Sequence, residues 1–406
     1  MVTTAKTFDV FSREFKREPG PTCAAMLAAG SVVRVRLPIF GATAFVTQHE
    51  SVERLLKAST DFSTDFLRSG RSGLATFLRW MPGPLRLLSE NMLQKDGVDH
   101  RRLRRLVDGA FRRNEIEALR PRIESIADEL IGRLARSSDG DLVRHVAREL
   151  PLAVICEMLG LPQEHRPQFT RWMASLSEVH SIGGVARLIP AINRINRYLR
   201  ARIEIRRADP QDDLISALVH AEGDGDRLSN NELLAMCFLL FVAGHETTTH
   251  LISVGTLTLL QNPGELERLR AEPDSASTAA DELLRHVSPV QMTKPRMPVG
   301  EMQFEGVTLR KGENVIAFLS SANRDPAVFD VPDRLDVKRR ENRHVAFGSG
   351  PHFCLGAWLG RAEMELFLKR LIDRAPNLQL SVPEDSLQWR RGTGLRAVNA
   401  LPVRLR

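Results

Sequence analysis

The amino-acid sequence predicts a mainly α-helical protein with small β-sheets at its periphery. From about residue 49 to residue 290, apolar residues recur mostly at three- and four-residue steps, the period of a helix face. One unusually long helical pattern covers residues 230–261, and short strand-like segments lie outside the helical stretch. No repeat, low-complexity segment or linker interrupts residues 1–406, so we expect a single domain.

The first part of the chain begins with two alternating segments, residues 31–37 and 42–47, which predict strands. Three amphipathic patterns, at residues 98–111, 123–135 and 142–160, then predict helices.

The long helical pattern has a signal at each end. Ser229 followed three residues later by Glu232 forms a capping box, and Asn262-Pro263 ends the pattern. A helix of this length spans about 50 Å, enough to cross a whole domain.

The remaining chain alternates short elements with one long irregular stretch. Residues 281–286 continue a helix that Pro289 stops, and residues 355–372 form another helical pattern. Residues 302–309 and 314–319 predict strands, and residues 323–344 show little periodicity. Such long loops are often functional.

Charge and composition exclude several classes of protein. The net charge is +7, but basic residues are scattered among 50 acidic ones without a basic arm, which argues against nucleic-acid binding. A basic patch for an acidic protein partner fits this charge at least as well. The four cysteines lie far apart, which suggests neither zinc nor disulfides and favours a cytoplasmic protein. We expect no membrane anchor, because the longest apolar run, residues 233–244, is too short to span a bilayer.

Two motif matches do not fit their usual chemistry. His245 and His250 flank Glu246 as in a zinc-protease helix, but they are five residues apart instead of four and point in different directions. Residues 392–397 match a dinucleotide-binding fingerprint, yet only nine residues follow, too few for its helix and acidic residue.

Cys354 lies in a glycine-rich loop, FGSGPHFCLG, residues 347–356. A lone free cysteine is most often a small buried apolar residue. Here Gly348, Gly350 and Gly356 permit tight turns and close approach to a planar group, and a helical pattern starts directly behind the cysteine. A helix N-terminus favours a thiolate, which is the form that ligates haem iron.

This loop resembles the haem-binding loop FGxGxHxCxG of the cytochrome P450 family, and every fixed position is filled. The resemblance extends over essentially the whole chain. It implies the cytochrome P450 fold, with haem b (iron protoporphyrin IX) between the long helix and the helix after the loop. It also implies that Phe347, Gly348 and Cys354 bind haem, with Cys354 as the iron ligand.

The segment AGHETT, residues 243–248, resembles the oxygen-activating segment of that family. The resemblance implies that Glu246 and Thr247 deliver protons to bound dioxygen where the helix bulges. In the alternative interpretation, Thr247 donates to a carbonyl of its own helix and Glu246 is solvated.

Two further motifs resemble structural and cofactor-binding parts of the family. Glu282 and Arg285 match its ExxR pair, with Arg334 in PDRL as the expected third member. Four residues match positions that bind the haem propionates: His100, Arg104, Arg296 and His352. Other arginines near Arg104 could do the same work.

The implied function is a monooxygenase that inserts one oxygen atom from dioxygen into a lipophilic terpenoid, steroid, fatty acid or polyketide-like substrate. Electrons would come from a ferredoxin or flavodoxin with its reductase, docking near Arg102 and Arg361, and we expect a monomer. By family position, the substrate pocket draws on residues 77–93, 239–243, 290–293 and 394–395. Arg79 and Arg86 are candidates for a substrate carboxylate, or exposed arginines only. The alternatives are a haem-thiolate sensor or binding protein and a peroxide-driven peroxygenase.

Overall fold

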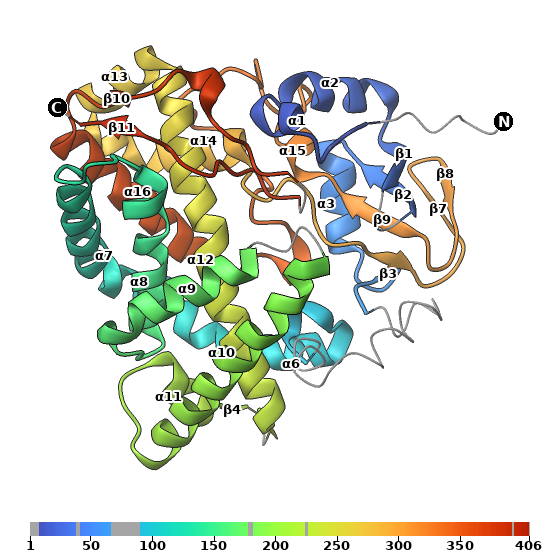
Figure 1. The fold of residues 1–406 in the computed structure, drawn as a ribbon. Coiled ribbons are helices and arrows are strands. Elements are labelled where there is room, and N and C mark those ends of the chain that lie inside the picture. The colour runs from blue at the N-terminus through green and yellow to red at the C-terminus, as the bar shows by residue number, and fades with distance from the viewer. Residues whose placement is uncertain are drawn as a thin grey trace.

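The computed structural model describes residues 8–37, 41–65, 90–177, 182–223, 226–391 and 394–405. Its longest element is helix α12, Asn230–Gln261, which runs through the middle of the molecule (Figure 1). The expected capping box is confirmed: the Ser229 hydroxyl accepts from the Glu232 amide, and the Glu232 carboxylate accepts from the Ser229 amide. The three-stranded sheet lies on one side of α12, and residues 113–158 lie on the other (Figure 1).

The strand side contains a three-stranded sheet with the order β1-β2-β9. β1 (Val32–Leu37) pairs antiparallel with β2 (Gly41–Val46), and β2 pairs parallel with β9 (Asn314–Ala317), so that Ala44 lies opposite Val315. The other sheets have two strands each: β3 (Phe62–Ser63) with β6 (Met297–Pro298), β4 (Glu222–Gly223) with β5 (Asp226–Arg227), β7 (Met302–Phe304) with β8 (Val307–Leu309), and β10 (Gln379–Leu380) with β11 (Val403–Arg404). The expectation of small peripheral sheets is confirmed.

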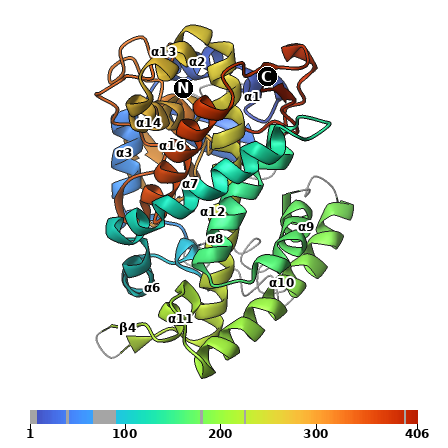
Figure 2. The same cartoon turned by 90° about the vertical axis from the view of Figure 1, so that its left-hand side faces the viewer.

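The helices follow the periodicity of the sequence closely. The apolar faces of α7, α8, α14 and α16 form the main core with α12; α8 and α16 lie beside α12 (Figure 2), and α7 packs on α16. The described helices are α1 (Arg13–Arg17), α2 (Gly20–Ala29), α3 (His49–Lys57), α6 (Gly97–Asp108), α7 (Arg113–Leu134), α8 (Glu149–Met158), α9 (Arg166–Ser177), α10 (Ile182–Ala208), α11 (Leu214–Val219), α13 (Pro263–Ala271), α14 (Ala276–Val287), α15 (Leu319–Ala322) and α16 (Ala357–Arg374).

Helix α12 remains α-helical throughout, so the bulge expected near Thr247 is absent. The Thr247 hydroxyl donates to the Ala243 carbonyl of its own helix at 3.0 Å. Further along, the buried hydroxyls of Thr249, Ser253 and Thr256 donate to carbonyls four residues earlier. A helix with this many polar side chains can therefore be buried without leaving their hydroxyls unpaired.

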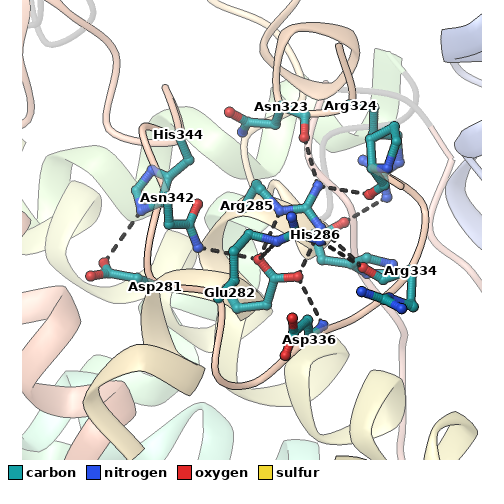
Figure 3. Close-up of polar contacts among 12 residues, drawn as sticks. Asp281, Glu282, Arg285, His286, Asn323, Arg324, Arg334, Asp336, Asn342 and His344 are labelled. Carbon is teal, nitrogen blue, oxygen red and sulfur yellow. Dashed lines mark hydrogen bonds and ion pairs between the residues drawn. The ribbon is translucent and has the colours of Figure 1, made fainter. Parts of the chain in front are cut away.

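An internal ion pair ties α14 to the irregular segment before the cysteine loop (Figure 3). Both side chains of Glu282 and Arg285 are fully buried and form two hydrogen bonds of 2.8 Å with each other. Arg285 also donates to the carbonyls of Asn323 and Pro332, at 2.8 and 2.7 Å. A buried charge pair is stable only when such partners satisfy it, so this network fixes the course of the segment.

The third charged member of this network is Arg339, not Arg334 as the sequence suggested. The Arg334 carbonyl accepts a hydrogen bond from the Arg285 guanidinium at 3.3 Å, whereas Arg334 itself is an exposed residue (Figure 3). The Arg339 guanidinium lies 3.1 Å from the Glu282 carboxylate and is largely buried. The turn at residues 331–334 points Arg334 outward, because the Arg334 amide closes it on the Val331 carbonyl.

Candidate active site

The cysteine loop is held in shape by contacts from distant parts of the chain. The Val345 amide donates to the Asn323 side chain at 2.8 Å, and the Cys354 amide donates to the Phe347 carbonyl at 2.9 Å. Gly350 has a φ of +70°, and a Cβ there would lie 2.6 Å from the Leu56 carbonyl oxygen of α3. Gly350 is therefore required both by its backbone angle and by this close approach.

The other two glycines of the loop differ in how strictly their positions require glycine. Gly348 has a φ of +72°, which favours glycine, whereas Gly356 has a φ of −85° with no atom near a hypothetical Cβ. The latter leaves the space beside Cys354 open.

Cys354 faces a cavity between α12 and α16. The cavity has two adjoining lobes of about 370 and 190 Å³, which share Thr247, Thr248, Phe347, Cys354 and Gly360 among their lining residues. One wall comes from α12 and the opposite wall from the cysteine loop and the start of α16. A flat apolar group fits between these two walls. Its metal centre would face Cys354, the one cysteine among the lining residues.

Cys354 is accessible from the cavity, yet desolvation by the surrounding protein raises the pKa of its thiol, against the opposing hydrogen bond from the Gly356 amide and the charges of Arg104 and Arg361. The sequence led us to expect a lowered pKa from the helix N-terminus alone. Desolvation of the thiolate is the larger effect here. A bound metal cation reverses the balance, because a coordinating thiol loses its proton.

Basic side chains gather at one edge of the cavity, and burial lowers the pKa of His100, to about 4, and that of His352. His100 is buried, and its ring lies 4.1 Å from that of His352 between centroids. Arg296 and His352 line the larger lobe, as does Lys294, which the sequence reasoning passed over although it lies in the same KPRMP segment. These groups are suited to two carboxylates such as the haem propionates.

Arg104 makes different contacts from the others. Its guanidinium donates to the carbonyls of Pro351 and Phe353, at 2.9 and 2.6 Å, and so holds the cysteine loop from the α6 side. Arg104 also lines the smaller lobe, and its contact with a propionate stays a prediction.

Asp96 places a negative charge beside this basic edge. Burial acts to raise the pKa of its carboxyl, but hydrogen bonds from His352, Ser63 and Thr64 outweigh burial and lower it. The Ser63 and Thr64 hydroxyls each donate to it at 2.7 Å. Asp96 thus links β3 to α6 and lies 3.5 Å from the imidazole of His352.

Glu246 and Thr247 lie next to each other on α12 but face different partners. The Glu246 carboxylate lies 3.2 Å from the Arg390 guanidinium and 3.8 Å from the His250 ring. Thr247 lines both lobes of the cavity. Part of the alternative interpretation is therefore correct, since Thr247 donates within its helix, but Glu246 is ion-paired instead of simply solvated.

Glu363 is a buried acid that the sequence reasoning missed. It lines the smaller lobe, and neither carboxylate oxygen has a partner with ordinary hydrogen-bond geometry among the described residues. Burial raises its pKa to about 8, with Thr248 opposing the rise only weakly. The helical phase could have found it, because Leu359 and Phe367 lie four residues away on the same apolar face.

Of the segments expected to face the substrate, those that the structure describes line or adjoin the cavity. Leu93, Val290, Met292 and Thr293 line the larger lobe, and Leu239 and Ala243 line the smaller one. Residues 394–395 lie behind Met292, with the Gln291 amide donating to the Gly394 carbonyl at 2.8 Å. Residues 77–89, with Arg79 and Arg86, lie outside the described residues.

The two histidines of the HETTTH segment have separate surroundings. His245 Nε2 lies 3.0 Å from the Arg148 carbonyl, whereas the buried His250 lies near Glu246.

Within the described residues, no helix is long and apolar enough to cross a membrane.

Comparison with known proteins agrees with the fold and the cavity. Residues 29–387 match the family model of cytochrome P450. The polyketide biosynthesis cytochrome P450 PksS of Bacillus subtilis is 42% identical over 318 residues, 78% of each chain. Vitamin D(3) 25-hydroxylase of Pseudonocardia autotrophica is 36% identical over 405 residues, which cover 99% of this chain and 97% of that one.

Solved structures agree as well. The structure of PksS superimposes with a TM-score of 0.90 at 37% identity, covering 98% of this chain and 99% of the other. A fold of this kind around a cysteine-walled cavity with basic side chains at one edge is that of a haem protein. The chain belongs to the cytochrome P450 family of monooxygenases, whose cofactor is haem.

Proposed function

We propose that Cys354 ligates the haem iron and that His100, Arg296, His352 and Lys294 hold the propionates. The observation that carries this proposal is the single cysteine at the wall of the cavity opposite α12, with basic side chains gathered at one edge. When bound, haem supplies the activation of dioxygen. The chain's own residues bind and orient haem, exclude water and move protons.

The iron ligand can be tested by a spectrum. The reduced protein with carbon monoxide should show the strongly red-shifted Soret band of thiolate ligation, and Cys354→Ala should abolish it. Cys23→Ala is the matched control, because Cys23 is buried in a different core. A purified protein that takes up no haem would refute the assignment.

Glu246 and Thr247 are proposed to carry protons into the cavity. Arg390 holds the Glu246 carboxylate at 3.2 Å, and the neighbouring Thr247 hydroxyl lines the cavity wall. The proposal rests on an acid and an alcohol at successive positions of α12, the two kinds of group that general acid catalysis uses, with Thr247 at the cavity wall and Glu246 paired with Arg390.

Thr247→Ala should lower the ratio of product formed to NADPH consumed. Thr256→Ala is a matched control, since the buried Thr256 hydroxyl makes the same type of bond, to the Ile252 carbonyl at 2.8 Å, away from the cavity. Equal coupling in both variants would rule out the relay. A haem-thiolate sensor, the alternative function, would show no turnover in any variant.

The substrate is proposed to be a lipophilic molecule of the polyketide or macrolide type. Leu93, Leu239, Val290 and Met292 offer apolar contacts, and the Thr293 hydroxyl already accepts from the Ala317 amide at 3.2 Å. Related proteins include 6-deoxyerythronolide B hydroxylase of Saccharopolyspora erythraea and mycinamicin IV hydroxylase/epoxidase of Micromonospora griseorubida.

A panel of macrolactones, fatty acids and steroids can be screened by the optical shift of ferric haem. Leu239→Trp should weaken a macrolactone about tenfold by overfilling the pocket. Ile205→Trp, at a residue exposed on α10, should leave binding unchanged. Binding of steroids or fatty acids in preference to macrolactones would correct the substrate class.

The redox partner is proposed to be an acidic ferredoxin or flavodoxin that docks near the cysteine loop. Arg101, Arg105 and Arg112 line a groove beside the loop, and Phe353 and Trp358 are exposed nearby in sequence. The earlier candidates make internal contacts: Arg361 bonds Asp281 at 2.6 Å, and Arg102 bonds Glu232.

Arg112→Glu should raise the KM for a ferredoxin about tenfold and flatten its salt dependence, since rim charges act mainly on association. Arg133→Glu on α7 is the control. Unchanged kinetics in Arg112→Glu would place the docking surface elsewhere.

We also propose that residues 1–406 act as one cytoplasmic, monomeric domain. Size-exclusion chromatography tests the oligomeric state.

A further inference from the structure

A second cavity, of about 540 Å³, shares no lining residue with the cavity that contains Cys354. Four arginines from separate parts of the chain line it: Arg13 in α1, Arg148 just before α8, and Arg390 and Arg391 near the C-terminus. The same wall includes His245 of α12, the residue directly before Glu246.

The charges around this cavity are unbalanced. None of its described lining residues is an aspartate or glutamate. Arg390 pairs with Glu246 behind the wall, whereas the guanidinium groups of Arg13, Arg148 and Arg391 make no ion pair or hydrogen bond with any residue that the structure describes. Guanidinium groups stay charged in proteins, so the described lining of this cavity carries several positive charges, with Arg13 and Arg391 exposed to solvent.

Neutral groups complete the wall. His245 is 6% exposed, and its Nε2 donates to the Arg148 carbonyl at 3.0 Å, which leaves Nδ1 as a buried acceptor without a partner among the described residues. Thr170 and Asn399 add a hydroxyl and an amide, and Trp389 closes one side. This wall offers hydrogen bonds to a polar ligand beside the apolar surface of Met173, Ala174 and Trp389.

We propose that this cavity binds a small, multiply charged oxyanion, either phosphate or a di- or tricarboxylate. Planar guanidinium groups recognise both through paired hydrogen bonds, and several converging arginines favour a ligand with more than one negative charge. Arg148 and Arg391 are its principal contacts.

Binding there has a consequence for the acid on α12. Arg390 lines the cavity and also pairs with Glu246, so an anion competes with Glu246 for the same guanidinium. The anion would thereby change how firmly the Glu246 carboxylate is held. This consequence rests on the role proposed above for Glu246, whereas binding of the anion does not.

Calorimetric titration of the haem-loaded protein with inorganic phosphate, at ionic strength held constant with chloride, tests the binding itself. We expect saturable binding that is weakened at least about tenfold in Arg148→Gln, the loss expected for one charge-assisted hydrogen bond. Arg391→Gln should weaken binding similarly. Because Arg391 is exposed, this variant should fold as the wild type does, so weaker binding would not reflect misfolding. Arg133→Gln, on α7 outside the cavity, should bind as the wild type does.

A parallel titration with citrate separates the two sources of oxyanion. Tighter saturable binding of citrate assigns the cavity to carboxylates, and tighter binding of phosphate assigns it to phosphates. The proposal is overturned if neither anion binds saturably, or if Arg148→Gln and Arg391→Gln bind as tightly as Arg133→Gln. Because the titration measures heat and not turnover, these outcomes are independent of whether the enzyme hydroxylates any substrate.

Discussion

Replacing Arg285 by alanine should destabilise the protein far more than the same change in an exposed pair of identical spacing. Arg285 makes two hydrogen bonds to Glu282 and others to the carbonyls of Asn323, Pro332 and Arg334. Its loss leaves the fully buried Glu282 with Arg339 as its remaining charged partner. Breaking a buried pair costs about 3–5 kcal/mol, and we expect the lower end because Arg339 stays.

Glu204 and Arg207 provide the control. They have the same three-residue spacing, with both side chains largely exposed at 66% and 42%. Pairs of this kind contribute about 0.5 kcal/mol or less, so Arg207→Ala should change little. The assay is the urea midpoint followed by circular dichroism, together with the haem content of each purified variant.

The result that refutes this reasoning is a midpoint for Arg285→Ala close to that of Arg207→Ala. If Arg285→Ala yields no folded protein, Arg285→Lys replaces it. Lysine keeps the charge but loses the paired geometry, so this variant should fall between the wild type and the estimate for alanine.

Three further changes have clear expected outcomes. Burial lowers the pKa of Lys16 to about 7, so the folded protein gains stability as pH rises through 7 toward 10.5, and Lys16→Met should raise the urea midpoint more at about pH 6 than at about pH 9. Burial raises the pKa of Glu363 to about 8, so stability is lost as pH rises from 4.5 through about 8, and Glu363→Gln should raise the midpoint at about pH 9 but not at about pH 4. Gly350→Ala should lower both the melting temperature and the haem content, because of its positive φ and the close carbonyl of α3, whereas Gly356→Ala should lower neither melting temperature nor folding yield. A pH-independent effect of the first two variants, or equal effects of the two glycine variants, would contradict these expectations.

Local sequence signals were sufficient for the helices and for the cysteine loop. Apolar periodicity and the Ser229 capping box located α12, because both signals depend only on neighbouring residues. The three glycines, the histidine and the cysteine of residues 347–356 lie so close together that their pattern, through its resemblance to the family's haem-binding loop, predicted Cys354 as the iron ligand.

The partners of the ExxR pair could not be read from the sequence in the same way. Glu204 and Arg207, and Glu265 and Arg268, share its spacing, yet at least one side chain of each pair is widely exposed. Burial at Glu282 depends on a segment some fifty residues later, which is why Arg339 was missed. The raised pKa of Cys354 also depends on desolvation by distant residues, whereas the helix N-terminus is a local feature.

The contacts of the cysteine loop also determine when this protein can acquire its cofactor during synthesis. Gly350 packs against Leu56, Arg104 holds the carbonyls of Pro351 and Phe353, and Asn323 holds Val345. Contacts between residues so far apart in the chain form late, after the loops between them have closed. The loop can therefore take this shape only once α3, α6 and residue 323 lie beside it, so we expect stable haem loading to follow the docking of these three segments.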